Sequence, residues 1–230
     1  MLPMFTSRLY EGDDFIFEHH RQSATTVLPQ AFLMHSISIK LDGPSKVEVW
    51  SGDKRARVTL TRGDMTIAPY RFSIDGAYVE PCEFLQLYLK PSVVDRAANQ
   101  LGRPAVIAPV LAAVDPLAEQ TIYQLEEELT SRRGTREYVN LLIETLATHL
   151  VKYYAEDAWT TKSVSGLPKY LLERTLDYIN SSLDRNLSIE EIASAVGIES
   201  ERLVRAFKAS TGKSIHRYID GLRVEQAKIR

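Results

Sequence analysis

One stretch near the C-terminus places side chains that can bind nucleic acid on a single face of an expected helix. These side chains recur at spacings of one, three and four residues and are Glu201, Arg202, Val204, Arg205 and Lys208. An α-helix fits the major groove of DNA, where an arginine can donate two hydrogen bonds to a guanine. The same face can also be the solvated charged side of an ordinary helical hairpin. The pattern alone therefore leaves both interpretations open.

The residues around this face predict two short helices that must position it. Ser188 with Glu191 three residues later forms a capping box, in which each side chain satisfies a free amide at the helix start. Gly197 can take the positive φ of a tight turn, and a second helix then begins at residue 199 or 200. Gly212 follows the end of that helix as a C-terminal cap. This order of signals predicts a helix-turn-helix.

Apolar residues in the same segment predict a shared core for the two helices. Ala193 lets the helices approach closely, and the side chains that can pack together are Ile192, Val196, Ile198, Leu203 and Phe207. Residues 167–230 hold 11 Lys and Arg against 9 Asp and Glu, so the segment is only mildly basic. The case for nucleic-acid binding therefore depends on helix geometry and not on net charge.

The spacing of apolar, glycine and basic residues across this segment resembles the AraC/XylS family of transcription regulators. The positions that carry the resemblance are Leu187, Glu191, Ala193, Gly197, Leu203, Arg205, Phe207, Lys208, Thr211, Gly212, Tyr218, Leu222, Arg223 and Ala227. The resemblance implies the first of two helix-turn-helix units, followed at residues 222–228 by the helix that joins them. The chain stops at Arg230 inside that helix, so the family's second helix-turn-helix is absent from this sequence. We therefore expect the chain to be part of a longer protein.

The resemblance also implies roles for side chains on the second helix. The implied base-contacting residues are Glu201, Val204 and Arg205, and the implied phosphate-contacting residues are Arg202 and Lys208. Arg205 is the expected main reader, although an ion pair with Glu201 four residues earlier is the structural alternative. For the two phosphate-contacting residues the alternative is a solvated surface charge. The family often has serine where this chain has Glu199, and acidic residues there suit the helix dipole but repel phosphates.

The first 105 or so residues predict β-structure. Residues 36–41 alternate between serine or lysine and isoleucine or leucine, a period of two that fits a strand with one buried face. Residues 47–50 and 57–61 flank a polar turn and predict a hairpin, and strands are also expected at 65–68 and 83–89. Short strands with turns about every ten residues favour a barrel or jelly roll. The resemblance, more loosely, implies a cupin-like effector domain for this part.

Two amphipathic helices are expected after the β-region. Asp115-Pro116 can start the first helix, residues 131–134 interrupt it, and Thr135 can cap the second. A short loop between two helices predicts an antiparallel hairpin, which the resemblance identifies with the family's linker and dimer helices. The apolar stripe can cover its own domain alone or also contact a partner subunit. We expect a homodimer.

The expected fold is α+β and has four parts along the chain. A cupin-like β-barrel or jelly roll is followed by a helical linker hairpin and by an all-α helix-turn-helix domain. The expected bounds are 1–105 for the effector domain, 106–156 for the linker and dimerisation region, 157–166 for a polar linker and 167–230 for the partial DNA-binding domain.

The metal-binding residues of cupin enzymes are missing from the expected barrel. Gly63 and Pro69 keep the spacing of the second cupin motif, but residues such as those at 73–74, Ser and Ile, occupy its later histidine position. The first motif, with His-x-His and a following Glu, is missing. His19 and His20 are adjacent, so on a strand they point to opposite faces and cannot easily hold one ion. We expect no metal, no cofactor and no catalytic residue.

A small barrel without a metal can still enclose one small ligand. The polar and aromatic side chains expected to contact such an effector are His20, His35, Trp50, Tyr70 and Tyr88. Each of these side chains is also of a type that often serves a purely structural role on a strand. His35 lies on the same face as Ile37 and Ile39, so we expect it to be buried.

The overall composition limits the remaining possibilities. The chain has 230 residues, a net charge of −2 and 44% hydrophobic residues, which excludes disorder of the whole chain. Cys82 is the single cysteine, so no intrachain disulfide can form. No apolar stretch approaches the roughly 18–20 residues that cross a bilayer. We also expect no export signal and a cytoplasmic location.

Together these features predict a sequence-specific DNA-binding transcription regulator that a small-molecule effector controls through the N-terminal domain. The resemblance implies that the effector changes which DNA half-sites a dimer can span. One alternative is a metal-dependent cupin enzyme with a helical tail, which stoichiometric bound metal would favour. The other is a DNA-silent module whose C-terminal helices bind another protein.

Overall fold

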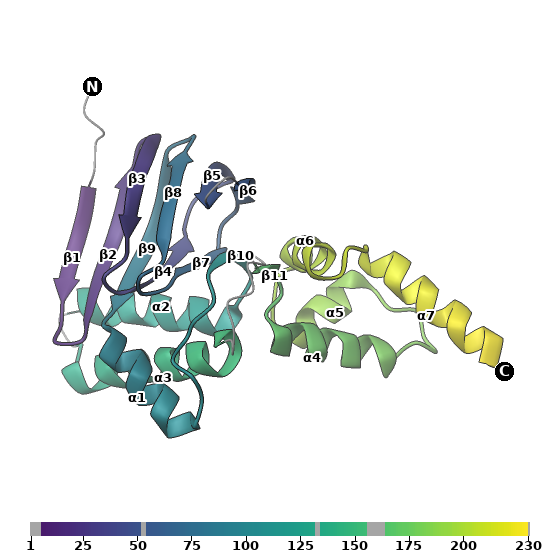
Figure 1. The fold of residues 1–230 in the computed structure, drawn as a ribbon. Helices are drawn as coiled ribbons and strands as arrows, with labels where there is room; N and C mark the ends of the chain where they lie inside the picture. The colour runs from purple at the N-terminus through teal and green to yellow at the C-terminus, as the bar shows by residue number, and fades with distance from the viewer. Residues whose placement is uncertain (1–5, 52–53, 132–133, 156–163, 230) are drawn as a thin grey trace. The chain divides into compact units, whose positions relative to one another are not determined.

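The computed structural model describes residues 6–51, 54–131, 134–155 and 164–229 (Figure 1). The chain forms two compact units, and each is described by itself. The first unit contains residues 1–112 and 117–163, and the second contains residues 113–116 and 164–230. None of the described helices is both long and apolar enough to cross a lipid bilayer.

Two β-sheets form the framework of the first unit. The larger sheet has the strand order β1-β2-β9-β4-β7-β10, with β1 (Thr6–Glu11), β2 (Phe15–Gln22), β4 (His35–Lys40), β7 (Met65–Ala68), β9 (Cys82–Leu89) and β10 (Val110–Ala113). The smaller sheet has the order β3-β8-β5-β6, with β3 (Thr25–Ala31), β5 (Ser45–Ser51), β6 (Lys54–Leu60) and β8 (Ser73–Tyr78). The central pairs β2–β9, β4–β9 and β4–β7 are antiparallel. These antiparallel sheets, with the helices that follow them, confirm the predicted α+β fold class.

The central strands of the larger sheet carry apolar side chains on one face. Phe17 pairs with Leu87, and Leu87 pairs with Ile37 on its other side, so the three side chains lie in one row. All three are fully buried. Figure 1 shows the helices of this unit gathered on one side of the sheets, namely α1 (Pro91–Leu101), α2 (Pro116–Thr130) and α3 (Arg136–Tyr154). His19, on the same face as Phe17, places its Nδ1 2.6 Å from Glu126 Oε1 of α2, so these helices cover the apolar face.

Helix α1 corrects the expectation that residues 1–105 are β-structure throughout. Pro91 follows the end of β9, and it also occupies the first turn of a helix, where its missing N–H is not needed. Val93, Val94 and Ala97 are buried at helical spacing, and Gly102 ends the helix with φ 60°. Arg96 of this helix lies 2.7 Å from carboxylate oxygens of both Asp14 and Glu144.

Helices α2 and α3 form the predicted hairpin. Thr135 caps α3, because its Oγ1 accepts a hydrogen bond from the Tyr138 amide at 3.4 Å. We expected residues 106–156 to form a region of their own, but the structure groups the hairpin with the strands in the first unit. The physical reason is the buried stripe of α3, which includes Ile143, Leu146 and Leu150 and packs within this unit.

The second unit is helical. It contains β11 (Val164–Gly166), α4 (Lys169–Asn180), α5 (Ile189–Val196), α6 (Ser200–Thr211) and α7 (Ile215–Ile229). Strand β11 falls at the end of the segment 157–166 that was expected to be a linker; residues 157–163 lie outside the described residues. The β11 segment is ordered because the Val114 amide donates a hydrogen bond to the Gly166 carbonyl at 3.0 Å.

The predicted helix-turn-helix signals are confirmed. Ser188 Oγ accepts from the Glu191 amide at 3.1 Å, and Glu191 Oε2 accepts from the Ser188 amide at 3.0 Å, which completes the capping box. Gly197 has φ 77° at the turn, and Gly212 has φ 73° after α6. α6 begins at Ser200, after an N-cap residue, Glu199, whose side chain makes no capping hydrogen bond.

One apolar core holds these helices together. Its buried residues include the predicted Ile192, Val196, Leu203 and Phe207, and Ile198 packs against them half-buried. The Phe207 ring also meets the Tyr218 ring of α7 edge-on at 5.5 Å.

The short segment 113–116 is part of this helical unit although it precedes α2 in sequence. Val114 is fully buried in the same core as Leu171 of α4. The Tyr170 hydroxyl donates a hydrogen bond to Asp115 Oδ1 at 3.0 Å. The second unit is therefore assembled from two separate stretches of the chain.

We predict that Ser188→Ala destabilises the second unit by about 1 kcal/mol, because an amide at the α5 start loses its side-chain acceptor. Urea unfolding of the whole chain measures the loss. Ser194→Ala is the matched control, since Ser194 is an exposed serine inside the same helix. Equal stability of the two variants would contradict the role assigned to the cap.

Candidate functional site

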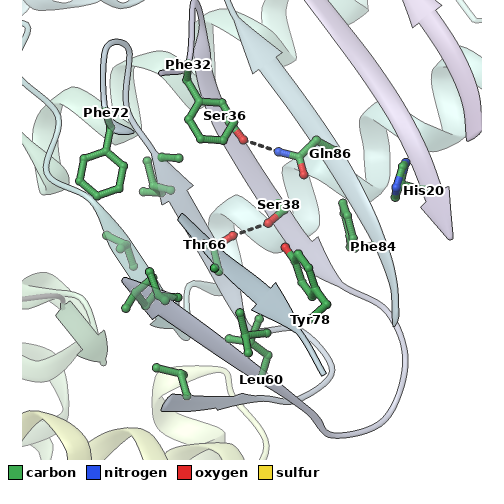
Figure 2. Close-up of a pocket in the computed structure, with 18 of the residues that line it drawn as sticks. His20, Phe32, Ser36, Ser38, Leu60, Thr66, Phe72, Tyr78, Phe84 and Gln86 are labelled. Carbon is green, nitrogen blue, oxygen red and sulfur yellow. Dashed lines mark hydrogen bonds between the residues drawn. The ribbon is translucent and has the colours of Figure 1, made fainter. Parts of the chain in front are cut away.

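A cavity of about 200 Å³ lies between the two sheets of the first unit (Figure 2). The larger sheet lines it with residues of β2, β4, β7, β9 and β10, and the smaller sheet lines it with residues of β5, β6 and β8. Phe32 and Phe72, which lie just outside the strands, complete the wall. The cavity thus occupies the space where a sandwich of two sheets would have its apolar core.

A row of polar side chains crosses the cavity face of the larger sheet. Strand pairing sets Glu18 beside Gln86, Gln86 beside Ser38, and Ser38 beside Thr66. Figure 2 shows two hydrogen bonds on this face: the Ser38 and Thr66 hydroxyls are bonded to each other, and Gln86 Nε2 donates to Ser36 Oγ. The second face of the sheet is therefore polar and still enclosed, because Ser36 and Gln86 are buried.

Aromatic rings form much of the remaining wall. The Phe84 ring lies 4.9 Å from His20 and stacks on Tyr78 at 6.1 Å with an interplanar angle of 14°. Burial, together with the nearby Glu18 carboxylate, raises the pKa of Tyr88 to about 12. Burial also raises the pKa of Tyr78. Both hydroxyls therefore stay neutral at pH 7, and each can donate or accept a hydrogen bond.

The structure places two of the five predicted effector-binding residues at the cavity. His20 and Tyr88 line it. His35 and Tyr70 are not among its described lining residues. The side chain of Trp50 lies outside the described part of the structure, so the prediction for this residue stays a prediction.

His35 lies on the apolar face of β4, opposite to the cavity face that carries Ser36 and Ser38. It is buried, as predicted, and its Nδ1 accepts a hydrogen bond from the Tyr70 amide at 3.3 Å. Burial lowers the pKa of His35 to about 4, although the Asp95 carboxylate acts in the opposite direction. This neutral imidazole binds backbone within the fold, so we leave His35 and Tyr70 out of the proposed ligand site.

The adjacent histidines point to opposite faces of β2, as strand alternation predicts. His19 Nε2 lies 2.7 Å from Glu83 Oε1 on the face that the helices cover, whereas His20 lines the cavity on the other face. Within the described residues, no three His, Cys, Asp or Glu side chains come close enough together to hold a metal ion. Gly63 of the cupin-like spacing takes φ 78°, which explains a glycine at that turn.

Sequence reasoning missed Gln86, Ser38 and Thr66 of the polar row, and it also missed Ser36, which is bonded to Gln86. The signal was present, because Ser36, Ser38 and Lys40 alternate with isoleucine and leucine, and Gln86 alternates with leucine. The alternation was interpreted as a strand with one buried face. The smaller sheet covers the second face too, and that fact comes from long-range pairing that no local pattern encodes.

The second unit presents the five predicted nucleic-acid contacts on α6. Glu201 and Lys208 are exposed, and Arg202, Val204 and Arg205 are half-buried. Val204 also packs against the apolar core, so part of its surface is committed to the fold. Buried Leu203, Ala206 and Phe207 fix the opposite face of the helix. The cap at α5 and this core hold α6 as a rigid element, which a base-reading helix requires.

Helix α3 keeps part of its predicted stripe exposed. Tyr138 is 40% exposed and Leu141 is 64% exposed, whereas Leu146 and Leu150 are buried. The exposed part is compatible with a partner subunit, and the homodimer stays a prediction.

Residues 179–220 match the sequence model of a family described as bacterial regulatory helix-turn-helix proteins, AraC family. The matched stretch begins at the end of α4, contains α5 and α6, and ends within α7. No curated protein sequence matches the chain.

Several solved structures are similar to the chain. An AraC-like transcriptional activator, CuxR, has 16% identity and a TM-score of 0.48 over 97% of this chain and 81% of that chain. A cupin superfamily protein from Desulfitobacterium hafniense has 13% identity and a TM-score of 0.32 over 38% of this chain and 78% of that chain. A cupin domain from Bordetella pertussis has 13% identity and a TM-score of 0.32 over 38% of this chain and 93% of that chain.

We predict that His35 makes the fold less stable as the pH falls from about 6.5 to about 4. In this range the imidazole binds a proton in the unfolded state but not in the folded state. Protonation therefore lowers the free energy of unfolding by up to about 3 kcal/mol. Urea unfolding at pH 7.0 and 4.5 measures the change, and His35→Gln should reduce it. His216→Gln, at an exposed histidine, should keep the wild-type pH dependence. An identical pH dependence in wild type and His35→Gln would contradict the assignment.

Proposed function

We propose, on the premise that residues 179–220 are a DNA-binding helix-turn-helix of the AraC family, that the protein is a transcription regulator controlled by a small effector. The effector occupies the cavity of the first unit. The observation that carries this second part is the enclosed polar row from Glu18 to Thr66. A sandwich core is normally apolar, and convergent polar groups in a concave apolar site are typical of ligand binding.

DNA recognition is assigned to α6. Arg205 lies at the middle of the face that carries Glu201 and Lys208, and its guanidinium can donate two hydrogen bonds to a guanine. Lys208 and Arg202 contact phosphates, which position the helix without specifying sequence. Glu201 and Val204 modify the local base preference.

Chain connectivity supports a route from the cavity to the reading helix. Val110 and Leu111 of β10 line the cavity. Three residues further, Val114 is fully buried in the core that also holds α6. A ligand that favours one conformation of β10 therefore acts on a strand that continues directly into the second unit, and it shifts the population of DNA-binding states.

The proposal also includes a homodimer, a cytoplasmic location and no enzymatic activity. These three parts rest on the sequence and on the resemblance of its C-terminal segment. Dimerisation raises the effective concentration of the second reading helix once the first has bound.

We predict that Arg205→Ala weakens binding of the full chain to its preferred DNA by about 1–3 kcal/mol and relaxes selectivity at one base pair. Lys208→Ala should instead weaken binding to all sequences and reduce the salt slope by about 1. The preferred DNA is obtained by selection from a random pool, and affinity is measured by fluorescence anisotropy at several salt concentrations.

The control for charge is Arg136→Ala, which removes an exposed arginine of the first unit that pairs with Asp13. It should leave affinity and selectivity unchanged. Wild-type selectivity in Arg205→Ala would show that α6 does not read bases through this residue.

We predict that Ser38→Phe abolishes the response to effectors, because the added ring fills the centre of the cavity. Metabolites that raise the melting temperature of the wild-type chain are identified first. Their effect on melting temperature and on DNA affinity should disappear in Ser38→Phe, whereas the variant without ligand should still bind DNA.

Ser92→Phe is the matched control, since Ser92 is an exposed serine on α1. It should keep the full response. A metabolite that still acts on Ser38→Phe would bind elsewhere and would overturn the cavity assignment. Thr66→Val removes the Ser38 partner without filling space, so it shows whether lost hydrogen bonding alone accounts for the effect.

A further inference from the structure

The charged groups around the cavity point to the charge of its ligand. Among the lining residues that the structure describes, two are acidic, Glu18 and Glu48, and none is lysine or arginine. Glu48 is already paired, because its Oε1 accepts a hydrogen bond from Arg57 Nε at 2.9 Å. Glu48 and Arg57 are direct neighbours on β5 and β6, and Arg57 is largely exposed. The Glu48 carboxylate is therefore neutralised at the outer surface of the smaller sheet.

Glu18 has no such partner among the side chains that the structure describes. It lies on β2 at the end of the polar row, beside Gln86, and it is half-buried. Among the described residues no cationic side chain forms an ion pair with its carboxylate. Glu18 is itself one of the residues that line the cavity. A half-buried carboxylate without a counter-ion repels an anionic ligand and attracts a cationic one.

The nearest buried cation does not change this balance. Lys40 lies on β4 beside a smaller adjoining cavity that shares Ser38 and Tyr78 with the main one. Its ammonium is buried and is paired with the Asp42 carboxylate. An anionic ligand would have to separate that pair before it could use Lys40.

The size and the aromatic walls of the cavity restrict the rest of the ligand. A dry cavity of about 150 Å³ holds a benzene-sized molecule, and this one measures about 200 Å³. Five aromatic residues line it, namely Phe32, Phe72, Phe84, Tyr78 and Tyr88. Such rings stack on a planar apolar body, and they also stabilise an ammonium by cation–π attraction.

We propose that the cavity binds a small organic cation of the arylalkylamine class, whose ammonium pairs with Glu18 and whose ring lies among the aromatic side chains. This inference rests on the proposed function only for the statement that the cavity is the effector site. It adds the ligand class and names Glu18 as the residue that selects for charge.

Three probes of nearly equal shape test the proposal: 2-phenylethylamine, 2-phenylethanol and phenylacetate, which are cationic, neutral and anionic at pH 7. Isothermal titration calorimetry with the full chain measures their affinities. The amine should bind about tenfold or more tightly than the alcohol, as expected for a hydrogen bond to a charged group. Phenylacetate should bind least. In Glu18→Gln the affinities for amine and alcohol should become equal, whereas Glu48→Gln should keep the wild-type preference.

Three results would overturn the proposal: no binding of the amine, binding of phenylacetate at least as tight as that of the amine, or an unchanged preference in Glu18→Gln. Thermal unfolding of each variant shows whether it is folded, and retained alcohol binding in Glu18→Gln shows that the cavity is intact. The regulatory role is read separately, as DNA affinity with and without the amine. Amine binding that leaves DNA affinity unchanged would support the ligand class and contradict the proposed regulation.

Discussion

The structure of the first unit depends on the alternation of side chains along β2, β4 and β9. In the central rows of these strands, Phe17, Leu87 and Ile37 lie on one face, and Glu18, Gln86 and Ser38 lie on the other. Because strand pairing aligns the rows, the larger sheet has one apolar face and one polar face. The apolar face needs the three helices, and the polar face, once covered by the smaller sheet, needs hydrogen-bond partners.

The need for hydrogen-bond partners on the covered polar face explains the polar pairs of the cavity. A buried hydroxyl or amide without a partner costs about 1–3 kcal/mol. The Ser38–Thr66 and Gln86–Ser36 pairs satisfy several of these groups inside the sheet itself. Glu18 is different, because its ionised carboxylate only accepts hydrogen bonds. Among the described side chains, no cation pairs with it. The sheet therefore stabilises an enclosed polar surface and leaves one strong acceptor on it.

The sequence predicted the local elements of the second unit well, because their signals are local. The Ser188–Glu191 capping box and the glycines at 197 and 212 each act within a few residues, and the structure confirms them. Helix α1 was missed because a proline after a strand marks both a strand end and a helix start. The position of Val114 could not be predicted, since its core neighbours lie more than fifty residues away in sequence.

The candidate sites show the same difference between features that local sequence predicts and features that depend on long-range contacts. The residues of α6 were found from helical spacing, and the structure places them on one helix. In the barrel, periodicity correctly showed that the strand faces differ, but it could not show that both faces are covered. His35 was considered a ligand contact, although it serves the apolar face, while Gln86 and Ser38 were not among the predicted ligand contacts.

The second unit consists of two separate stretches, residues 113–116 and 164–230. This arrangement limits how genetic recombination can exchange its helices between proteins. A genetic exchange at residues 157–163 would transfer the helices but leave Val114 and Asp115 behind with the donor's barrel. The transplanted helices would then lack a buried apolar side chain and the acceptor for Tyr170. A different first unit could replace this one only if it supplied an equivalent four-residue peptide, so the two units are constrained to be inherited together.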